Sequence, residues 1–122
     1  MVSVSEEKSD IVELVQKYLD AFMHGDSTLM EGVFHKTAAI HGFVDGQNWA
    51  GDGEALAEFC DSNPPGKESG MNGKSTVMEI TEKSASVRID LQNYHGFTFV
   101  DYLSLQKIDG RWFVVGKCFS EV

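Results

Sequence analysis

The hydrophobic residues change their spacing along the chain, from a helical period near the N-terminus to a strand period in the last third. In the first segment, apolar side chains recur every three or four residues on one helical face: Ile11, Leu14, Val15, Tyr18, Leu19 and Phe22. Later, apolar and polar residues alternate over four segments, at residues 75–81, 84–91, 97–108 and 112–119. This order predicts an α+β fold, with N-terminal helices packed on a curved, mainly antiparallel sheet.

Caps and turn residues divide the rest of the chain. Ser3 and Glu6 have capping-box spacing, and Gly25 can end the first helix. Asp26 and Asp52 can each cap a later helix. Between these helices we expect a strand at residues 37–43 and a loop at 44–52, and a flexible Pro- and Gly-rich loop at 61–74. Asp109-Gly110 predicts a tight hairpin.

The size and charge of the chain limit its function. It has 122 residues, which predicts a single domain over residues 1–122. The net charge is -9, so the chain lacks the basic surface that binding to nucleic acids or anionic membranes requires. No apolar segment has the length of a signal peptide or a membrane span, which predicts a cytoplasmic protein.

Neither the cysteines nor the histidines indicate a bound cofactor or metal. Cys60 and Cys118 both lie among apolar neighbours, so we expect two free, buried thiols. His24, His35 and His95 have no zinc-ligand spacing with these cysteines. No phosphate loop or dinucleotide fingerprint is present, so we expect neither cofactor nor metal.

Asp101 is the most informative residue for function. It shares one face of its strand with Phe97, Phe99 and Leu103, so its carboxyl group points into an apolar interior. Tyr18 points toward the same interior from the helix, where a buried hydroxyl needs a hydrogen-bond partner. Asp101 is either a pocket acid or a structural acid satisfied by backbone amides or a hydroxyl.

Three segments together resemble the nuclear transport factor 2-like superfamily, which has a cone-shaped, cystatin-like fold. They are VQKYLDAFMHGDSTLMEGVFHKTAAIHG, GQNWAGDGEALAEFC and GFTFVDYLSLQKIDGRWFVVGKCF. Within the superfamily, the chain looks most like the SnoaL-like and "putative lumazine-binding" branch. The resemblance implies an internal pocket for a small organic ligand.

The resemblance also implies roles for individual residues. Ketosteroid isomerases of this superfamily hold an oxyanion with a helix tyrosine and a neutral strand aspartic acid, positions that Tyr18 and Asp101 match. Gly42 stands near the place of their general base, so steroid isomerisation by that mechanism is not expected. His41 is the substitute candidate if its strand face points inward; the alternative is a histidine at the rim or outside.

Three functions remain open at this stage. The first is a small-molecule-binding protein, with a pocket lined by Tyr18, Phe22, Trp49, Phe59, Phe97, Phe99 and Asp101. The second is a cofactor-free isomerase, cyclase or dehydratase with His41 as base and Tyr18 and Asp101 as oxyanion donors. The third is an interaction module with a filled cone. Val100 and Tyr102 alternate with the buried row, which predicts a homodimer through the outer sheet face.

Overall fold

The computed structural model describes residues 3–66 and 69–122, and it confirms the α+β fold. Residues 67–68, within the loop predicted at 61–74, lie outside the described residues. The elements follow in the order α1 (Val4–His24), the 3-10 helix η1 (Ser27–Met30), β1 (Phe34–Val44), β2 (Gln47–Gly51), α2 (Gly53–Ser62), β3 (Asn72–Ile80), β4 (Ser84–Tyr94), β5 (Phe97–Ile108) and β6 (Arg111–Glu121).

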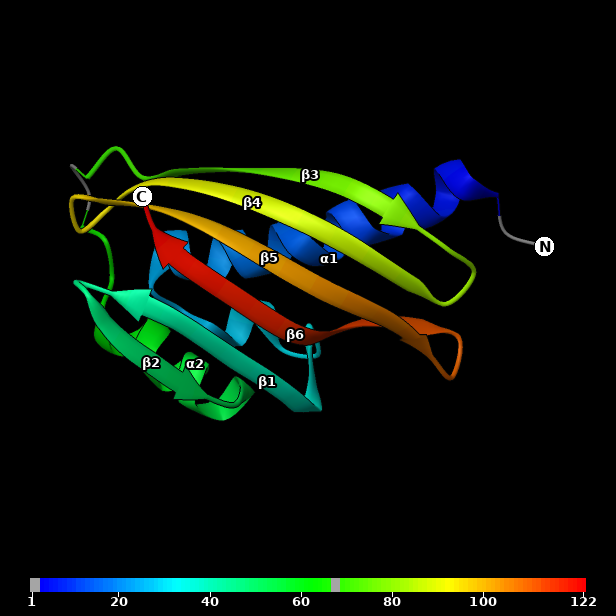
Figure 1. The fold of residues 1–122 in the computed structure, drawn as a ribbon, viewed down its shortest axis with the longest axis horizontal. Coiled ribbons are helices and arrows are strands. Elements are labelled where there is room, and N and C mark those ends of the chain that lie inside the picture. Colours follow the sequence, from blue (N-terminus) through cyan, green and yellow to red (C-terminus); the bar gives the residue numbers. More distant parts are fainter. Residues whose placement is uncertain (1–2, 67–68) are drawn as a thin grey trace.

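The strands form one sheet in the order β2-β1-β6-β5-β4-β3. Neighbouring strands are antiparallel except for β1 and β6, which are parallel. Figure 1 shows α1 and α2 behind the same face of the sheet, with α1 crossing β3 to β6 and α2 beside β1 and β2. The helices and this inner face therefore enclose the interior.

The predicted caps of α1 are confirmed. The Ser3 side chain accepts a hydrogen bond from the Glu6 backbone amide, which satisfies one of the free donors of the first turn. Gly25 ends the helix in the left-handed conformation, with φ 63°, and its amide donates back to the last turn. The two caps delimit a helix of 21 residues, and the buried residues of α1 run along one of its faces from Glu7 to Phe22.

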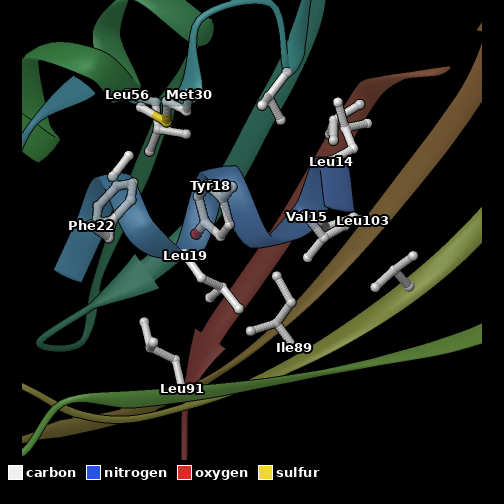
Figure 2. Close-up of a cluster of buried hydrophobic side chains, with 14 of the residues drawn as sticks. Leu14, Val15, Tyr18, Leu19, Phe22, Met30, Leu56, Ile89, Leu91 and Leu103 are labelled. Atoms are coloured by element: carbon white, nitrogen blue, oxygen red, sulfur yellow. The ribbon is translucent and has the colours of Figure 1, made fainter. Parts of the chain in front are cut away.

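The core lies between α1 and the inner face of the sheet. In Figure 2, Leu14, Tyr18 and Phe22 project from α1, while Ile89 and Leu91 project toward them from β4. These side chains are at most 8% exposed, so they form a continuous apolar layer. Buried residues recur every three or four positions in α1 and every second position in β4, and the two sets of side chains meet in this layer.

Two of the local predictions differ from the structure. Residues 44–52 are not a loop, because Gln47–Gly51 form β2 and pair with β1 in a hairpin. Asp45 and Gly46 make its turn with positive φ angles of 50° and 75°, a conformation that this Asp-Gly pair favours. The second helix is only the short 3-10 helix Ser27–Met30, capped by Asp26.

A bulge in β6 changes which side chains face inward. Gly116 pairs with Ser104 and Val114 pairs with Leu105, which leaves Val115 as an extra residue. Trp112 and Val114 are buried before the bulge, and Lys117 and Phe119 are buried after it. Cys118 is consequently exposed, so the prediction of two buried thiols is correct only for Cys60.

Both cysteines are free, as expected. The thiol of Cys60 donates to the Ala21 carbonyl at 3.3 Å, which ties α2 to the end of α1. Across the described part of the chain, neither helix combines the length and apolar character that crossing a membrane requires.

Candidate functional site

An apolar pocket lies between α1, α2 and the inner face of the sheet. Every element except η1 and β3 contributes a residue to its walls. The twelve wall residues are Tyr18, Phe22, Val44, Trp49, Leu56, Phe59, Leu91, Tyr94, Phe99, Asp101, Lys117 and Phe119. All of them except Asp101 and Lys117 are apolar or aromatic. Its charged groups, Asp101 and Lys117, come from the adjacent strands β5 and β6. Such a lining, with a few polar groups at one place, is typical of small-molecule sites.

Tyr18, Asp101 and Lys117 form a hydrogen-bonded cluster inside this pocket. The Tyr18 hydroxyl donates to Oδ2 of Asp101 at 3.0 Å, and Lys117 Nζ donates to the Tyr18 hydroxyl oxygen at 2.5 Å. Lys117 Nζ lies 3.9 Å from the same Asp101 oxygen. The three residues are 2%, 2% and 7% exposed, so the cluster is shielded from water.

Burial determines the protonation of the cluster. Loss of hydration raises the pKa of Asp101, although the Lys117 charge and the Tyr18 hydrogen bond oppose that rise. Loss of hydration lowers the pKa of Lys117, with Asp101 opposing. It also raises the pKa of Tyr18, which the Asp101 charge raises further. The environment therefore keeps the proton on Tyr18. It also brings the charged form and the neutral form of the Lys117–Asp101 pair closer in free energy.

Aromatic rings surround the ammonium group of Lys117. Its Nζ lies 4.7 Å from the ring centres of both Tyr18 and Phe119, and 5.5 Å from that of Phe22. Ring faces attract a cation, so these contacts partly replace the lost water. They also leave the lysine with very few polar neighbours.

Gly42 on β1 makes room for one of these rings. A Cβ atom at this position would lie 2.4 Å from the Phe119 ring, closer than carbon atoms approach in proteins. The absence of a side chain at Gly42 therefore allows Phe119 to lie against β1 and form the pocket wall beside Lys117. An aspartate at this position would displace that wall.

Most of the predicted ligand-binding residues line this pocket. Tyr18, Phe22, Trp49, Phe59, Phe99 and Asp101 are wall residues. Phe97 is not a wall residue, although its ring packs on Phe99 with centres 6.0 Å apart. Trp49 packs against Phe59 and Phe119, at 6.1 and 6.3 Å between ring centres, and is half-buried.

His41 does not reach the pocket. It shares a face of β1 with Ala39 and Phe43, as predicted, but all three are exposed on the outer side of the sheet. Ile40 and Gly42 are the inward positions of this strand. The structure thus places His41 away from Tyr18 and Asp101, and the inward orientation we considered for it is wrong.

Sequence reasoning did not identify Lys117. Counting from Trp112 with a strand period of two places Lys117 on the outer face, and the bulge at Val115 reverses that assignment. The one available signal was Gly116, because a glycine within a strand often marks a bulge.

The cavity inside these walls is narrow. The space open to the centre of a water-sized sphere is about 30 Å³, and the whole empty volume, including the mouth, is about 420 Å³. Ligand pockets commonly measure roughly 300–1,000 Å³. A ligand larger than a few water molecules therefore requires side chains at the mouth to move, and Trp49 is the largest half-buried one.

The fold and the pocket define an NTF2-like protein, a class in which helices close a curved sheet around an interior. Solved structures support this assignment. An NTF2-like protein of unknown function from Shewanella baltica superposes with a TM-score of 0.85 at 31% identity, covering 100% of this chain and 98% of that one. A ketosteroid isomerase-like protein from Erwinia carotovora atroseptica has the same fold, with a TM-score of 0.65 at 21% identity, covering 96% and 97%.

Sequence comparison gives the family. The model of the family described as "Putative lumazine-binding" matches residues 6–120, so the chain belongs to this family. A curated relative, "Aldolase FrzH" from Cladobotryum sp., is 29% identical over 116 residues, which cover 94% of this chain and 91% of that protein.

Proposed function

We propose that this protein binds a compact, mainly apolar organic molecule that carries a carbonyl or enolate oxygen. The oxygen would lie at the Tyr18–Asp101–Lys117 cluster, and the rest of the molecule would lie against the aromatic walls. The observation that carries this proposal is a buried lysine amine beside a buried tyrosine hydroxyl in an otherwise apolar pocket. Lys117 uses one N–H group on Tyr18 and has others for an oxygen that holds partial or full negative charge, and Tyr18 can donate to the same oxygen when its single hydroxyl hydrogen turns from Asp101.

The energetics of burial support a functional cluster over a purely structural one. Replacing a buried ion pair with apolar residues of similar size is often neutral or stabilising. The Lys117–Asp101 pair is deeply buried and its oxygen–nitrogen distance is 3.9 Å, longer than a direct hydrogen bond. Stability alone therefore gives little reason to place these two charges in the interior. This argues against the alternative of a cone filled only for packing.

A carbonyl ligand also agrees with the name of the curated relative. That relative is named an aldolase, and aldol chemistry makes or breaks a carbon–carbon bond next to a carbonyl group. The same cluster could support the second candidate function, a cofactor-free enzyme that moves protons at the carbon next to a carbonyl. Tyr18 and Lys117 then take the oxyanion role that we predicted for Tyr18 and Asp101.

Paired ligands test the proposal. Acetophenone and ethylbenzene have similar shape, and only acetophenone carries a carbonyl oxygen. Titrations followed by protein NMR should show tighter binding of acetophenone, by roughly 5- to 100-fold for one or two hydrogen bonds to a charged or polar donor. Equal affinity for both ligands, or no binding of either, would contradict the proposal.

Two tyrosines provide a matched control. Tyr18→Phe removes the hydroxyl at the cluster and should abolish most of the preference for the ketone. Tyr94→Phe removes another hydroxyl of the pocket wall, but this one donates to the Asn63 carbonyl at 2.6 Å instead of the cluster. The Tyr94→Phe protein should therefore keep the preference for acetophenone.

A further inference from the structure

We propose that Lys117 is a covalent nucleophile, whose amine condenses with the carbonyl carbon of the ligand to form an iminium ion. This inference rests on the proposed function, because the carbonyl group must first reach the cluster. It adds a covalent step that binding alone does not require. Three features of the pocket support this step: the position of Nζ, its hydrogen-bond partners and the apolar walls around it.

The lysine must first lose a proton, and the cluster has a path for it. Lys117 Nζ donates to the Tyr18 hydroxyl oxygen, and that hydroxyl donates to Asp101. A proton can pass from Nζ to the tyrosine oxygen while the tyrosine proton passes to the carboxylate. The result is a neutral amine, a neutral tyrosine and a neutral carboxylic acid, with no net loss of protons from the site.

The surroundings favour this neutral arrangement. Burial lowers the pKa of Lys117 and raises that of Asp101, which brings the two groups closer to exchanging a proton. Within the described part of the chain, the titratable groups that act on the amine or line its pocket are Tyr18 on α1, Cys60 on α2, Tyr94 on β4 and Asp101 on β5. Burial raises the pKa of both Tyr94 and Cys60, the latter to about 11, so both stay neutral near pH 7. Asp101 is then the only group among these that can hold the ammonium charged.

The covalent step balances without any co-reactant. The amine lone pair attacks the carbonyl carbon, and the carbonyl oxygen becomes a hydroxyl by taking a proton from the nitrogen. Asp101, through Tyr18, returns the stored proton to this hydroxyl, which leaves as water while the C=N bond forms. The iminium ion then accepts the electron pair of a neighbouring C–H bond, whose proton passes through Tyr18 to the Asp101 carboxylate, which gives a neutral enamine. Addition of water reverses the sequence and restores the free lysine.

The apolar walls protect such an intermediate. An iminium ion is hydrolysed by water, and the lining restricts water to the narrow cavity. The Phe22 and Phe119 rings that face the ammonium group would also face the iminium charge. Desolvation of an amine in an apolar pocket is an established way to activate lysine as a nucleophile.

The test uses 2,4-pentanedione, a small diketone that condenses with neutral amines to give a stable conjugated enaminone. Incubation of the full-length protein near pH 7, followed by peptide mass spectrometry, should locate the adduct on Lys117. Its formation should be faster than on exposed lysines such as Lys83, because burial lowers the pKa of Lys117 and so raises the fraction of neutral amine near pH 7. Absence of an adduct on Lys117, or a rate equal to that of Lys83, would overturn the inference.

Two variants complete the experiment. Lys117→Arg keeps a cation but forms no enaminone, so the fast phase of the near-ultraviolet absorbance should disappear and only the slow phase of the exposed lysines should remain. Lys83→Met removes an exposed lysine and should leave the fast adduct unchanged. Because the adduct is mapped in the wild-type protein, the result does not depend on whether Lys117→Arg folds. Selective acetophenone binding without an adduct would overturn this inference and leave the proposed function standing, whereas loss of both would contradict both.

Discussion

The Tyr18 hydroxyl donates to Asp101 at 3.0 Å across 83 positions of sequence, and this bond joins α1 to the centre of the sheet. Lys117 donates to the same hydroxyl. The tyrosine is therefore both acceptor and donor between two charged groups.

Lys117→Met should abolish the preference for acetophenone over ethylbenzene and should destabilise the fold in a pH-dependent way. Without the Lys117 charge, burial raises the pKa of Asp101 further above its ordinary value, and the folded chain then binds more protons than the unfolded one between these two values. We expect a deficit of roughly 3 kcal/mol near pH 7 that shrinks toward pH 4. Thermal unfolding at both pH values measures it, and a deficit that does not change with pH would contradict the explanation.

Asp101→Asn should destabilise the fold in a pH-dependent way. The charge of Asp101 raises the pKa of Lys117 and so opposes the effect of burial. Without Asp101, the pKa of Lys117 in the folded protein falls further below 10.5, its ordinary value in the unfolded chain. Between the folded and the unfolded pKa of Lys117, the unfolded chain binds more protons than the folded one, so stability must rise with pH. We expect a deficit of roughly 3 kcal/mol near pH 6 that shrinks toward pH 9. Urea unfolding at both pH values measures it, and a deficit independent of pH would contradict the explanation.

Gly42→Ala should damage the pocket wall. The added Cβ overlaps the Phe119 ring, which must move toward Lys117 or push β1 aside. Overpacking of this kind costs about 1–3 kcal/mol, and acetophenone affinity should fall with it. Gly116→Ala is the control in the same sheet, because a Cβ there meets its nearest atom at 3.8 Å, an ordinary contact. Equal unfolding midpoints for the two variants would show that the overlap is relieved without cost.

Trp49→Ala should open the mouth of the pocket. Trp49 packs on Phe59 and Phe119, and β2, which carries it, is an edge strand of the sheet. Its removal should accelerate ligand exchange in NMR line-shape measurements while the preference for the ketone remains, since the cluster is untouched. Unchanged exchange rates would place the entrance elsewhere.

Tyr102→Glu should weaken a homodimer formed through the outer sheet face. Tyr102 is 47% exposed, and Phe43, on the same outer side of the sheet, is 48% exposed. A charge buried in such a contact would be costly. Light scattering at micromolar concentration should show a dimer for the wild type and a lower mass for Tyr102→Glu. Val12→Glu, at a 38% exposed position on α1, is the control, because this helix covers the inner face of the sheet, and it should leave the mass unchanged. A wild-type monomer would contradict this interface.

The sequence was sufficient to predict the fold and two members of the cluster. Tyr18 follows from the helical period and Asp101 from an uninterrupted strand period, because both elements keep their period through the site. The remaining features depend on tertiary context. Lys117 points inward only because of the bulge before it, and the outward direction of His41 depends on which face of β1 the helices cover. A strand period identifies the residues that share a face but does not identify the buried face.

The hairpin at Asp45-Gly46 was missed for a different reason. The turn signal is as strong as that of Asp109-Gly110, which we predicted correctly, and both turns have positive φ at each residue. The following strand is only five residues long and has no clear alternation of apolar residues. The Asp-Gly turn signal therefore indicates the hairpin at residues 44–51, whereas the spacing of apolar residues does not.

The most direct test of the proposed ligand site is the ¹³C chemical shift of carbonyl-labelled acetophenone bound to the protein. Hydrogen bonds from Tyr18 and Lys117 would polarise the carbonyl group and move this shift downfield of its value in an apolar solvent. We expect a downfield shift in the wild type that is reduced in Tyr18→Phe and retained in Tyr94→Phe. A bound carbonyl with the shift it has in hydrocarbon, unaffected by Tyr18→Phe, would contradict the account.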